Sequence, residues 1–133
     1  MGKNFHSRLR VRLSETDALG VVYYGQYLTY FDVARLEMLR EAGITLGYLK
    51  KSRLGFVAAG VSCRYLASVR FDDVLDINVR ISKIGDSSVT YEHQVKRGKK
   101  TVALGQVTDV LVDHSGKATA ISKDVRSKLS VYG

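Results

Sequence analysis

The chain contains no proline and only one cysteine, Cys63, among its 133 residues. A single cysteine cannot form an internal disulfide, and the three histidines, His6, His93 and His114, show no metal-ligand spacing. No apolar run approaches the roughly 20 residues of a membrane-spanning helix, and the N-terminus lacks the apolar centre of a signal peptide. We therefore expect a cytoplasmic protein that holds no metal ion and does not insert into a membrane.

Length and composition predict one globular domain. The chain is 45% hydrophobic and 26% charged, which are ordinary values for a folded protein. At about 100–200 residues per domain, a single domain spans residues 1–133. Without proline, the turns of this domain must rely on its 12 glycines.

The net charge is strongly positive, with 21 Lys and Arg against 13 Asp and Glu and a balance of +8. A basic protein attracts polyanions such as nucleic acid, an anionic membrane surface or a phosphorylated ligand, but a solvated basic surface explains the charge equally well. The sequence contains no recognisable helix-turn-helix, zinc finger or RNA-binding sheet. We therefore expect no nucleic-acid partner.

The hydrophobic pattern predicts an α+β domain. One long helix is expected over residues 26–42, because its apolar residues share one helical face. These residues are Tyr27, Phe31, Ala34, Met38 and Ala42. Alternating apolar and polar residues predict strands over 7–14, 56–65, 75–84, 89–95 and 101–113, with a short helical turn over 123–129. Short turns between strands favour an antiparallel sheet, and one helix leaves a sheet face or edge uncovered, which favours a homo-oligomer.

The loop before the long helix is the place where the sequence suggests chemistry. Asp17 precedes a glycine-containing turn and the start of the helix, where the first N–H groups lack intrahelical acceptors and carry the positive end of the helix dipole. Such N–H groups can stabilise the oxyanion of an attacked thioester or ester, and a carboxylate can attack the carbonyl or take a proton from water. An aspartate here also commonly caps or turns the chain, so the residues alone leave both roles open.

Two segments carry a family resemblance: Glu15–Tyr27, with the sequence ETDALGVVYYGQY, and Phe31–Arg35, with the sequence FDVAR. They resemble the signature of the hotdog-fold acyl-CoA thioesterases, in the branch that contains 4-hydroxybenzoyl-CoA thioesterase and the bacterial YbgC-type enzymes. The resemblance covers essentially the whole chain. It implies an antiparallel five-stranded sheet wrapped around one long central helix. It also implies hydrolysis of acyl-CoA at a site between subunits of a homotetramer, a dimer of dimers, with no cofactor beyond the coenzyme A of the substrate.

The resemblance also implies roles for individual residues. Asp17 is the expected catalytic carboxylate, acting as a nucleophile through a mixed anhydride or as a general base. The backbone N–H of Tyr24 is expected to polarise the thioester carbonyl. YbgC-type members commonly have histidine at this position, so the Tyr24 side chain resembles the hydroxybenzoyl branch instead. The expected substrate-binding residues are Val22, Tyr23, Gly25, Tyr27, Lys83, Ser87 and Ser88.

Other polar residues receive less specific interpretations. Basic side chains near strand ends suit the phosphates of coenzyme A, and the candidates are Lys83, Arg97, Lys99 and Lys100. Asp32 and Glu37 on the helix are interpreted as structural or interfacial, with Arg35 pairing with one of them. Cys63 and His93 follow the period of buried strands and are interpreted as structural.

Two positions depart from the pattern of the family, since Ser68 and Ser122 stand where relatives often carry proline. This change affects the rigidity of turns more than the chemistry, because proline chiefly fixes φ. The alternative function is a non-catalytic module that binds acyl-CoA or acyl carrier protein, which the same fold and basic rim could support. The presence of Asp17 in the matching loop favours the enzyme.

Overall fold

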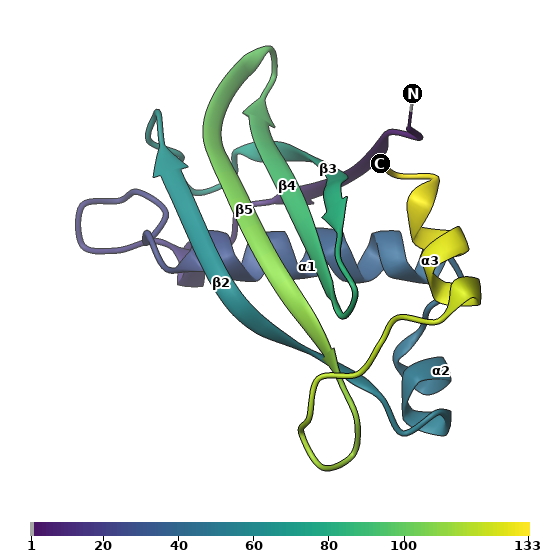
Figure 1. Ribbon diagram of the computed structural model, residues 1–133. Helices are drawn as coiled ribbons and strands as arrows, with labels where there is room; N and C mark the ends of the chain where they lie inside the picture. Colours follow the sequence, from purple (N-terminus) through teal and green to yellow (C-terminus); the bar gives the residue numbers. More distant parts are fainter. Residues whose placement is uncertain (1) are drawn as a thin grey trace.

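The computed structural model describes residues 2–133, which form one antiparallel sheet packed against a long helix (Figure 1). The strands are β1 (Phe5–Arg10), β2 (Gly55–Tyr65), β3 (Val74–Ile84), β4 (Ser88–Arg97) and β5 (Lys100–Val112). The helices are α1 (Gln26–Glu41), α2 (Leu46–Lys51) and α3 (Lys123–Ser130), with a short 3-10 helix, η1, over Leu13–Glu15. The strand order is β1-β3-β4-β5-β2, and every neighbouring pair is antiparallel. The predicted α+β class is confirmed.

The sheet curves around α1 (Figure 1), and alternate residues of β3 and β4 are buried. On β3 the buried positions are Leu75, Ile77, Val79 and Ile81. On α1, Phe31, Ala34 and Met38 are fully buried. Burying an apolar side chain of the larger sizes is worth roughly 1.5–3 kcal/mol. This shared core therefore holds the N-terminus of α1 at a fixed place relative to the sheet.

The predicted first strand, over residues 7–14, is wrong at its C-terminal end. β1 ends at Arg10, and η1 begins at Leu13. The chain turns here because the Glu15 carboxylate accepts hydrogen bonds from the Arg12 backbone N–H and from the Tyr30 hydroxyl, each at 2.9 Å. The alternating pattern of residues 7–14 could not reveal this turn, because Glu15 and Tyr30 lie outside the segment.

The other predicted elements agree with the structure within a residue or two at each end. After α1, Gly43 has a φ of +84°, the left-handed conformation that favours glycine at a helix end. Between α1 and β2, where the hydrophobic pattern predicts no element, the structure has α2, and Thr45 Oγ1 accepts a hydrogen bond from the Tyr48 N–H at 3.0 Å. A helix of six residues is too short for its periodicity to show in the sequence. None of the helices in residues 2–133 is long and apolar enough to span a membrane.

One edge of the sheet is formed by β2, which pairs only with β5 among the described strands. Most β2 residues are exposed, and the side chains of Val57, Val61 and Tyr65 are each close to half exposed. On α1, Leu28 and Leu36 are also exposed. The helix and the edge strand therefore leave apolar surface uncovered in a single chain.

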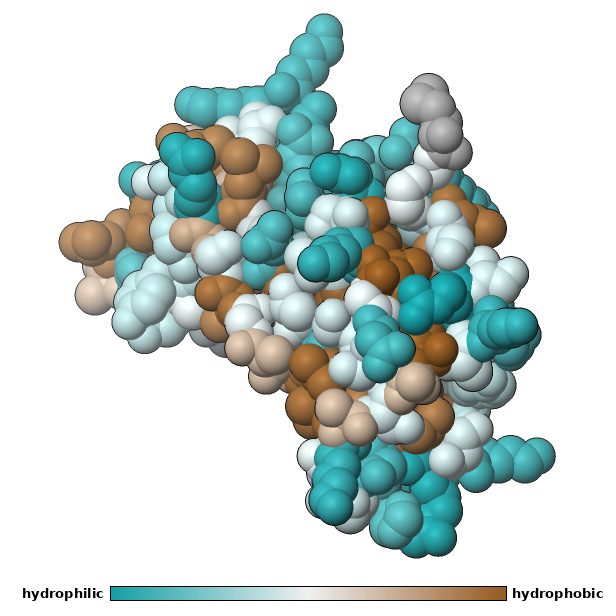
Figure 2. Space-filling view, in the orientation of Figure 1, coloured by the Kyte–Doolittle hydropathy of each residue, from teal (hydrophilic) through white to brown (hydrophobic). Residues whose placement is uncertain are grey.

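The loop between η1 and α1 projects from the left of the molecule in Figure 1. Leu19 on this loop is 81% exposed, and Tyr24 at its end is 64% exposed. Figure 2 shows hydrophobic side chains gathered at this end of the surface. The fold therefore presents the segment that carries Asp17 outside the core, directly before α1.

Candidate active site

Asp17 lies in a small hairpin that is closed by its own backbone. Thr16 and Val22 pair across the hairpin. The Asp17 N–H donates to the Val21 carbonyl at 2.9 Å, and the Gly20 N–H donates to the Asp17 carbonyl at 2.9 Å. Gly20 has a φ of +78°, which glycine adopts without the strain that a side chain would add. The sequence thus forms a tight turn that presents the Asp17 carboxylate at the surface.

One oxygen of the Asp17 carboxylate has a structural partner. Oδ1 accepts a hydrogen bond from the Leu19 N–H at 2.9 Å, which is the geometry of an Asx turn. Oδ2 has no hydrogen-bond partner within residues 2–133. The two roles that the sequence left open are therefore compatible, since Asp17 turns the chain with one oxygen and keeps the other available for chemistry.

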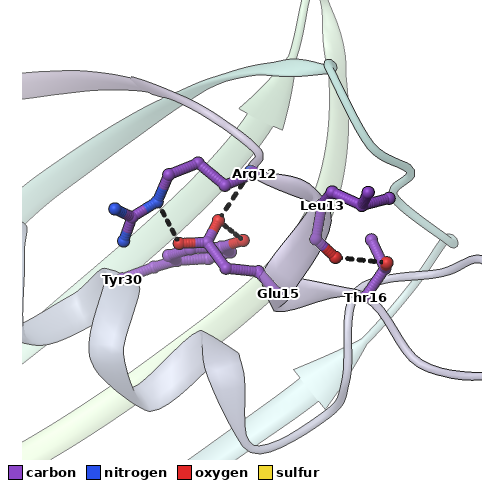
Figure 3. A network of polar contacts seen from close by, with 5 residues as sticks. All are labelled: Arg12, Leu13, Glu15, Thr16 and Tyr30. Carbon is purple, nitrogen blue, oxygen red and sulfur yellow. Dashed lines mark hydrogen bonds and ion pairs between the residues drawn. The ribbon is translucent and has the colours of Figure 1, made fainter.

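A buried carboxylate, Glu15, fastens the base of this hairpin to α1 (Figure 3). Its Oε1 accepts from the Arg12 N–H and the Tyr30 hydroxyl, and its Oε2 accepts from Arg12 Nε at 3.0 Å. The Glu15 carbonyl accepts from the Tyr23 N–H at 3.0 Å. Burial acts to raise the pKa of Glu15, but the hydrogen bonds from Arg12 and Tyr30 outweigh it and lower the pKa. Sequence reasoning quoted Glu15 only as part of the motif and missed the role of Tyr30.

The start of α1 provides unpaired N–H groups beside the hairpin, and one of them belongs to Tyr24. The Tyr23 carbonyl accepts from the Gln26 N–H at 2.9 Å, and the Gly25 carbonyl accepts from the Leu28 N–H at 3.2 Å. The Tyr24 N–H has no acceptor in the part of the chain that the structure describes. This N–H group lies at the positive end of the helix dipole, where an oxyanion is stabilised. Its position suits the predicted role of Tyr24.

Asp17 and the start of α1 meet at one cavity of about 390 Å³. Four of the predicted site residues line it, namely Asp17, Val22, Tyr24 and Tyr27. The other walls come from Val21, from Tyr65 at the end of β2 and from residues 66–69. Two of the remaining predicted residues lie beside it, because the Tyr23 ring packs against the Tyr24 ring with 4.5 Å between centroids and lies where it would meet a Cβ on Gly25 at 2.8 Å.

Tyr65 is a site residue that the sequence did not reveal. Its hydroxyl donates to the Tyr24 carbonyl at 2.9 Å, and its ring meets the Tyr27 ring edge to face with 5.1 Å between centroids. Burial raises the pKa of Tyr65 to about 12, so its phenol stays protonated and able to donate. Tyr65 therefore fixes the peptide that follows Tyr24. No local pattern predicts this contact, because it joins residues 41 positions apart.

Three predicted substrate-binding residues, Lys83, Ser87 and Ser88, do not line this cavity. They lie at the turn between β3 and β4, where the Asp86 carbonyl accepts from the Ile121 N–H at 2.9 Å, near α3. Figure 1 places this turn well away from the loop before α1. Within one chain the structure does not bring these residues to Asp17.

Arg97 is a basic candidate that contacts a wall of the cavity. Its Nη1 donates to the Ser68 carbonyl at 2.7 Å and lies 3.2 Å from an Asp73 carboxylate oxygen. Ser68 lines the cavity, so Arg97 holds one of its walls. Lys99 and Lys100 are exposed at the adjacent turn between β4 and β5.

The remaining polar side chains have structural partners or lie in the core. The Glu37 carboxylate accepts from the Ser7 hydroxyl at 2.7 Å and ties α1 to β1. His93 is 2% exposed and stacks on Phe31, and burial lowers its pKa to about 3, which keeps it neutral. Burial also raises the pKa of the half-buried Cys63 thiol. Across residues 2–133 no group of three or more His, Cys, Asp or Glu side chains is arranged to hold a metal ion.

The antiparallel sheet of this chain wraps around the central helix α1, which is the hotdog architecture. Asp17 and an unpaired N–H group lie at the start of that helix. The family model described as "Thioesterase-like superfamily" matches residues 11–129, so the chain belongs to that superfamily. The acyl-CoA thioester hydrolase YbgC of Escherichia coli is 32% identical over 98 residues, which cover 74% of this chain and 73% of that protein. The acyl-CoA thioesterase YbgC of Haemophilus influenzae is 29% identical over 96% of this chain and 95% of its own.

Solved structures agree with this family. A protein of Aquifex aeolicus superposes with a TM-score of 0.90 at 30% identity, covering 94% of this chain and 98% of the other. The gentisyl-coenzyme A thioesterase BH1999 superposes with a TM-score of 0.85 at 27% identity, covering 94% of this chain and 98% of the other. The predicted hotdog fold and the family resemblance are confirmed.

Proposed function

We propose that the protein hydrolyses acyl-CoA thioesters to a carboxylic acid and coenzyme A. The observation that carries this proposal is the cavity in which the Asp17 carboxylate and the start of α1, with its unpaired Tyr24 N–H, lie together. The names of the YbgC relatives and of the gentisyl-coenzyme A thioesterase support the same substrate class.

In this reaction the Tyr24 N–H donates to the thioester carbonyl oxygen and stabilises the negative charge that develops there. A donor of this kind typically contributes about 2.7–4 kcal/mol to the transition state. Asp17 Oδ2 either attacks the carbonyl carbon, expelling the coenzyme A thiolate and forming a mixed anhydride that water opens, or takes a proton from the water that attacks. In both routes one water is consumed, the carbon–sulfur bond breaks, and the thiolate leaves as coenzyme A. The site requires no further cofactor.

The working form is a homo-oligomer, expected as a dimer of dimers. The exposed edge strand β2 and the exposed apolar residues of α1 support this, because such surface is normally covered. The cavity at Asp17 is not lined by Lys83, Ser87 and Ser88 of the same chain. In the oligomer, a second copy of the chain would supply these three residues at the coenzyme A phosphates. The lone cysteine keeps the cytoplasm as the expected compartment.

The test is release of thiol from a panel of acyl-CoA substrates, from short aliphatic to hydroxybenzoyl and long-chain, by the wild type and Asp17→Asn. We expect the variant to bind substrate and to lose turnover by a factor of about a thousand or more, because the amide can neither attack nor accept a proton. Asp124→Asn, an exposed substitution of the same kind on α3, is the matched control. Near-normal turnover in Asp17→Asn would remove Asp17 from the mechanism.

The second candidate is a non-catalytic module that binds acyl-CoA or acyl carrier protein. The observation in its favour is the Asx turn, since an aspartate that turns the chain needs no chemical role. Binding of acyl-CoA by calorimetry without thiol release from any member of the panel would establish this candidate in place of the enzyme.

A further inference from the structure

Tyr27 contributes a buried phenol to the wall of the Asp17 cavity. It is the second residue of α1, and its side chain is only 3% exposed. The neighbouring hydroxyls are both used, because Tyr30 donates to Glu15 (Figure 3) and Tyr65 donates to a backbone carbonyl. The Tyr27 hydroxyl has no hydrogen-bond partner in residues 2–133. A buried donor without an acceptor is unfavourable, so the cavity favours an occupant that offers one.

The free hydroxyl of Tyr27 faces the cavity. The unpaired polar atoms that are sealed in the core all belong to other residues, so the Tyr27 hydroxyl reaches accessible space. The space that this side chain lines is the Asp17 cavity. The other polar side chains in the wall are Asp17, Tyr24, Tyr65 and Ser68. Tyr24 and Ser68 are exposed and the Tyr65 hydroxyl is already bonded, so Tyr27 is the buried donor that the described wall leaves free.

Two aromatic contacts fix the orientation of the Tyr27 ring. It meets the Tyr65 ring with 5.1 Å between centroids and the Tyr30 ring with 5.8 Å, in both cases edge to face. Such pairs of rings are favourable in this geometry. Burial raises the pKa of Tyr27, so the phenol stays protonated at neutral pH and is able to donate. The donor is therefore held in place before a substrate arrives.

Tyr27 and the Tyr24 N–H belong to the same end of α1. The two residues are three positions apart, and both line the cavity. The side chain of a helical residue leans back towards the N-terminus of its helix. The Tyr27 side chain therefore leans towards the end of α1 where the Tyr24 N–H lacks an acceptor in the described chain. Two donors and the Asp17 carboxylate thus surround one space.

The thioester carbonyl oxygen is the acceptor that gains most from a second donor. This oxygen has two lone pairs, and the Tyr24 N–H occupies one of them. When the carbonyl is attacked, negative charge develops on the oxygen, and a preorganised donor stabilises it. The phenol keeps its proton throughout, so the balance of the hydrolysis is unchanged.

We propose that Tyr27 is a catalytic residue whose hydroxyl donates a second hydrogen bond to the thioester carbonyl oxygen, beside the Tyr24 N–H. This inference rests on the proposed function for the placement of the thioester at Asp17. It assigns Tyr27 to the reacting carbonyl, whereas the sequence suggested only a role in substrate binding.

The first test compares thiol release by the wild type and by Tyr27→Phe, which keeps the ring and removes the hydroxyl. The probes are hexanoyl-CoA and benzoyl-CoA, whose acyl groups carry no polar substituent that the phenol could bind. We expect kcat to fall about a hundredfold with both probes and KM to change little, as is typical when one oxyanion donor is lost. Tyr48→Phe, which removes a phenol bonded to Asp124 on α3, is the matched control and should keep its kcat. A wild-type kcat in Tyr27→Phe would overturn the proposal.

The second test observes the carbonyl itself, because a distorted site would also lower kcat. Infrared difference spectra of the isotope-labelled carbonyl are recorded for each probe bound to Asp17→Asn and to the double variant Asp17→Asn with Tyr27→Phe. A hydrogen bond weakens the carbonyl double bond, so we expect its stretching frequency to rise when the Tyr27 hydroxyl is removed. Tyr48→Phe in the same background should leave the frequency unchanged. If the frequency is the same with and without the Tyr27 hydroxyl, Tyr27 does not contact the carbonyl and the proposal is wrong, even where kcat falls.

Failure of the two proposals can be told apart. If the wild type releases no thiol from any acyl-CoA but the carbonyl frequency depends on Tyr27, hydrolysis fails and the contact remains assigned. If the wild type releases thiol and neither kcat nor the carbonyl frequency depends on Tyr27, the enzyme stands and the second donor fails.

Discussion

At the scale of single residues, Glu15 supports the site without contacting the cavity. Its carboxylate is held by Arg12 and Tyr30, and its carbonyl holds Tyr23 at the base of the Asp17 hairpin. Because the pKa of Glu15 is lower in the folded chain than in the unfolded chain, the ionised group stabilises the fold above its unfolded pKa. That contribution is lost as the pH falls through the folded pKa.

This linkage predicts a specific loss of stability in acid. We expect the free energy of unfolding of the wild type to fall as the pH drops below the ordinary value of 4.5 for this carboxyl. Glu15→Gln should be less stable at neutral pH by roughly 1–3 kcal/mol, and its decline in acid should be shallower. Urea unfolding at a series of pH values measures both. Glu92→Gln, in an exposed ion pair with Arg80, is the control and should decline like the wild type. If the free energies of unfolding of Glu15→Gln and the wild type fell in parallel with pH, the loss of stability in acid would not come from Glu15.

Tyr65 allows a second test at the residue scale. Tyr65→Phe removes the hydrogen bond to the Tyr24 carbonyl but keeps the ring that lines the cavity. We expect kcat to fall about tenfold with little change in KM, because the peptide that follows the oxyanion donor at Tyr24 loses its anchor while the walls of the cavity remain. Tyr24→Phe should have a mild effect, since its backbone N–H survives. Steady-state kinetics of both variants measure these changes in kcat and KM. A rise in KM alone for Tyr65→Phe would show that Tyr65 acts in substrate binding instead.

At the scale of secondary-structure elements, the fit between α1 and β5 depends on one missing side chain. A Cβ placed on Gly105 would lie 2.2 Å from the Phe31 ring, so the helix can approach the strand this closely only over glycine. Phe31 in turn stacks on His93 of β4. The helix that carries the active-site N-terminus is therefore positioned by contacts in the middle of the sheet.

Gly105→Ala is expected to destabilise the fold by about 1–3 kcal/mol, because the added methyl group overpacks the core. Gly60→Ala on β2 is the matched control, since a Cβ there meets no atom within 4 Å. It should change stability by less than about 0.5 kcal/mol. Thermal or urea unfolding compares the two, and equal stability of both variants would show that Phe31 moves aside without cost.

The same elements show what the sequence could and could not predict. Apolar periodicity predicted α1 and four of the strands within a residue or two, because each buries one regular face in a common core. It was wrong at Leu13, where hydrogen bonds that the Glu15 carboxylate accepts override the alternating pattern. In the site, the motif placed Asp17 and Tyr24 at one cavity, whereas the role of Tyr65 and the contact of Arg97 with Ser68 were not predicted, because these contacts join segments far apart in the chain.

At the scale of the whole molecule, the exposed edge strand sets the expected assembly. Val57 on β2 is 49% exposed, and an edge strand of 11 residues invites pairing with another chain. Val57→Lys is expected to weaken the oligomer and to lower specific activity, because a charged side chain on an edge opposes pairing. Val131→Lys, at a position 51% exposed after α3, is the matched control. Light scattering coupled to gel filtration measures the mass of each, and a wild type that is monomeric would contradict the assembly.

The Asp17 hairpin is closed by its own hydrogen bonds and anchored through Glu15, while the exposed apolar surface of α1 and β2 is built from other side chains. The carboxylate and the assembly surface therefore belong to separate parts of the chain. Substitutions at Leu28, Val57 or Val61 can change how copies of the chain associate during evolution, or in a directed library, without rebuilding the hairpin that presents the carboxylate.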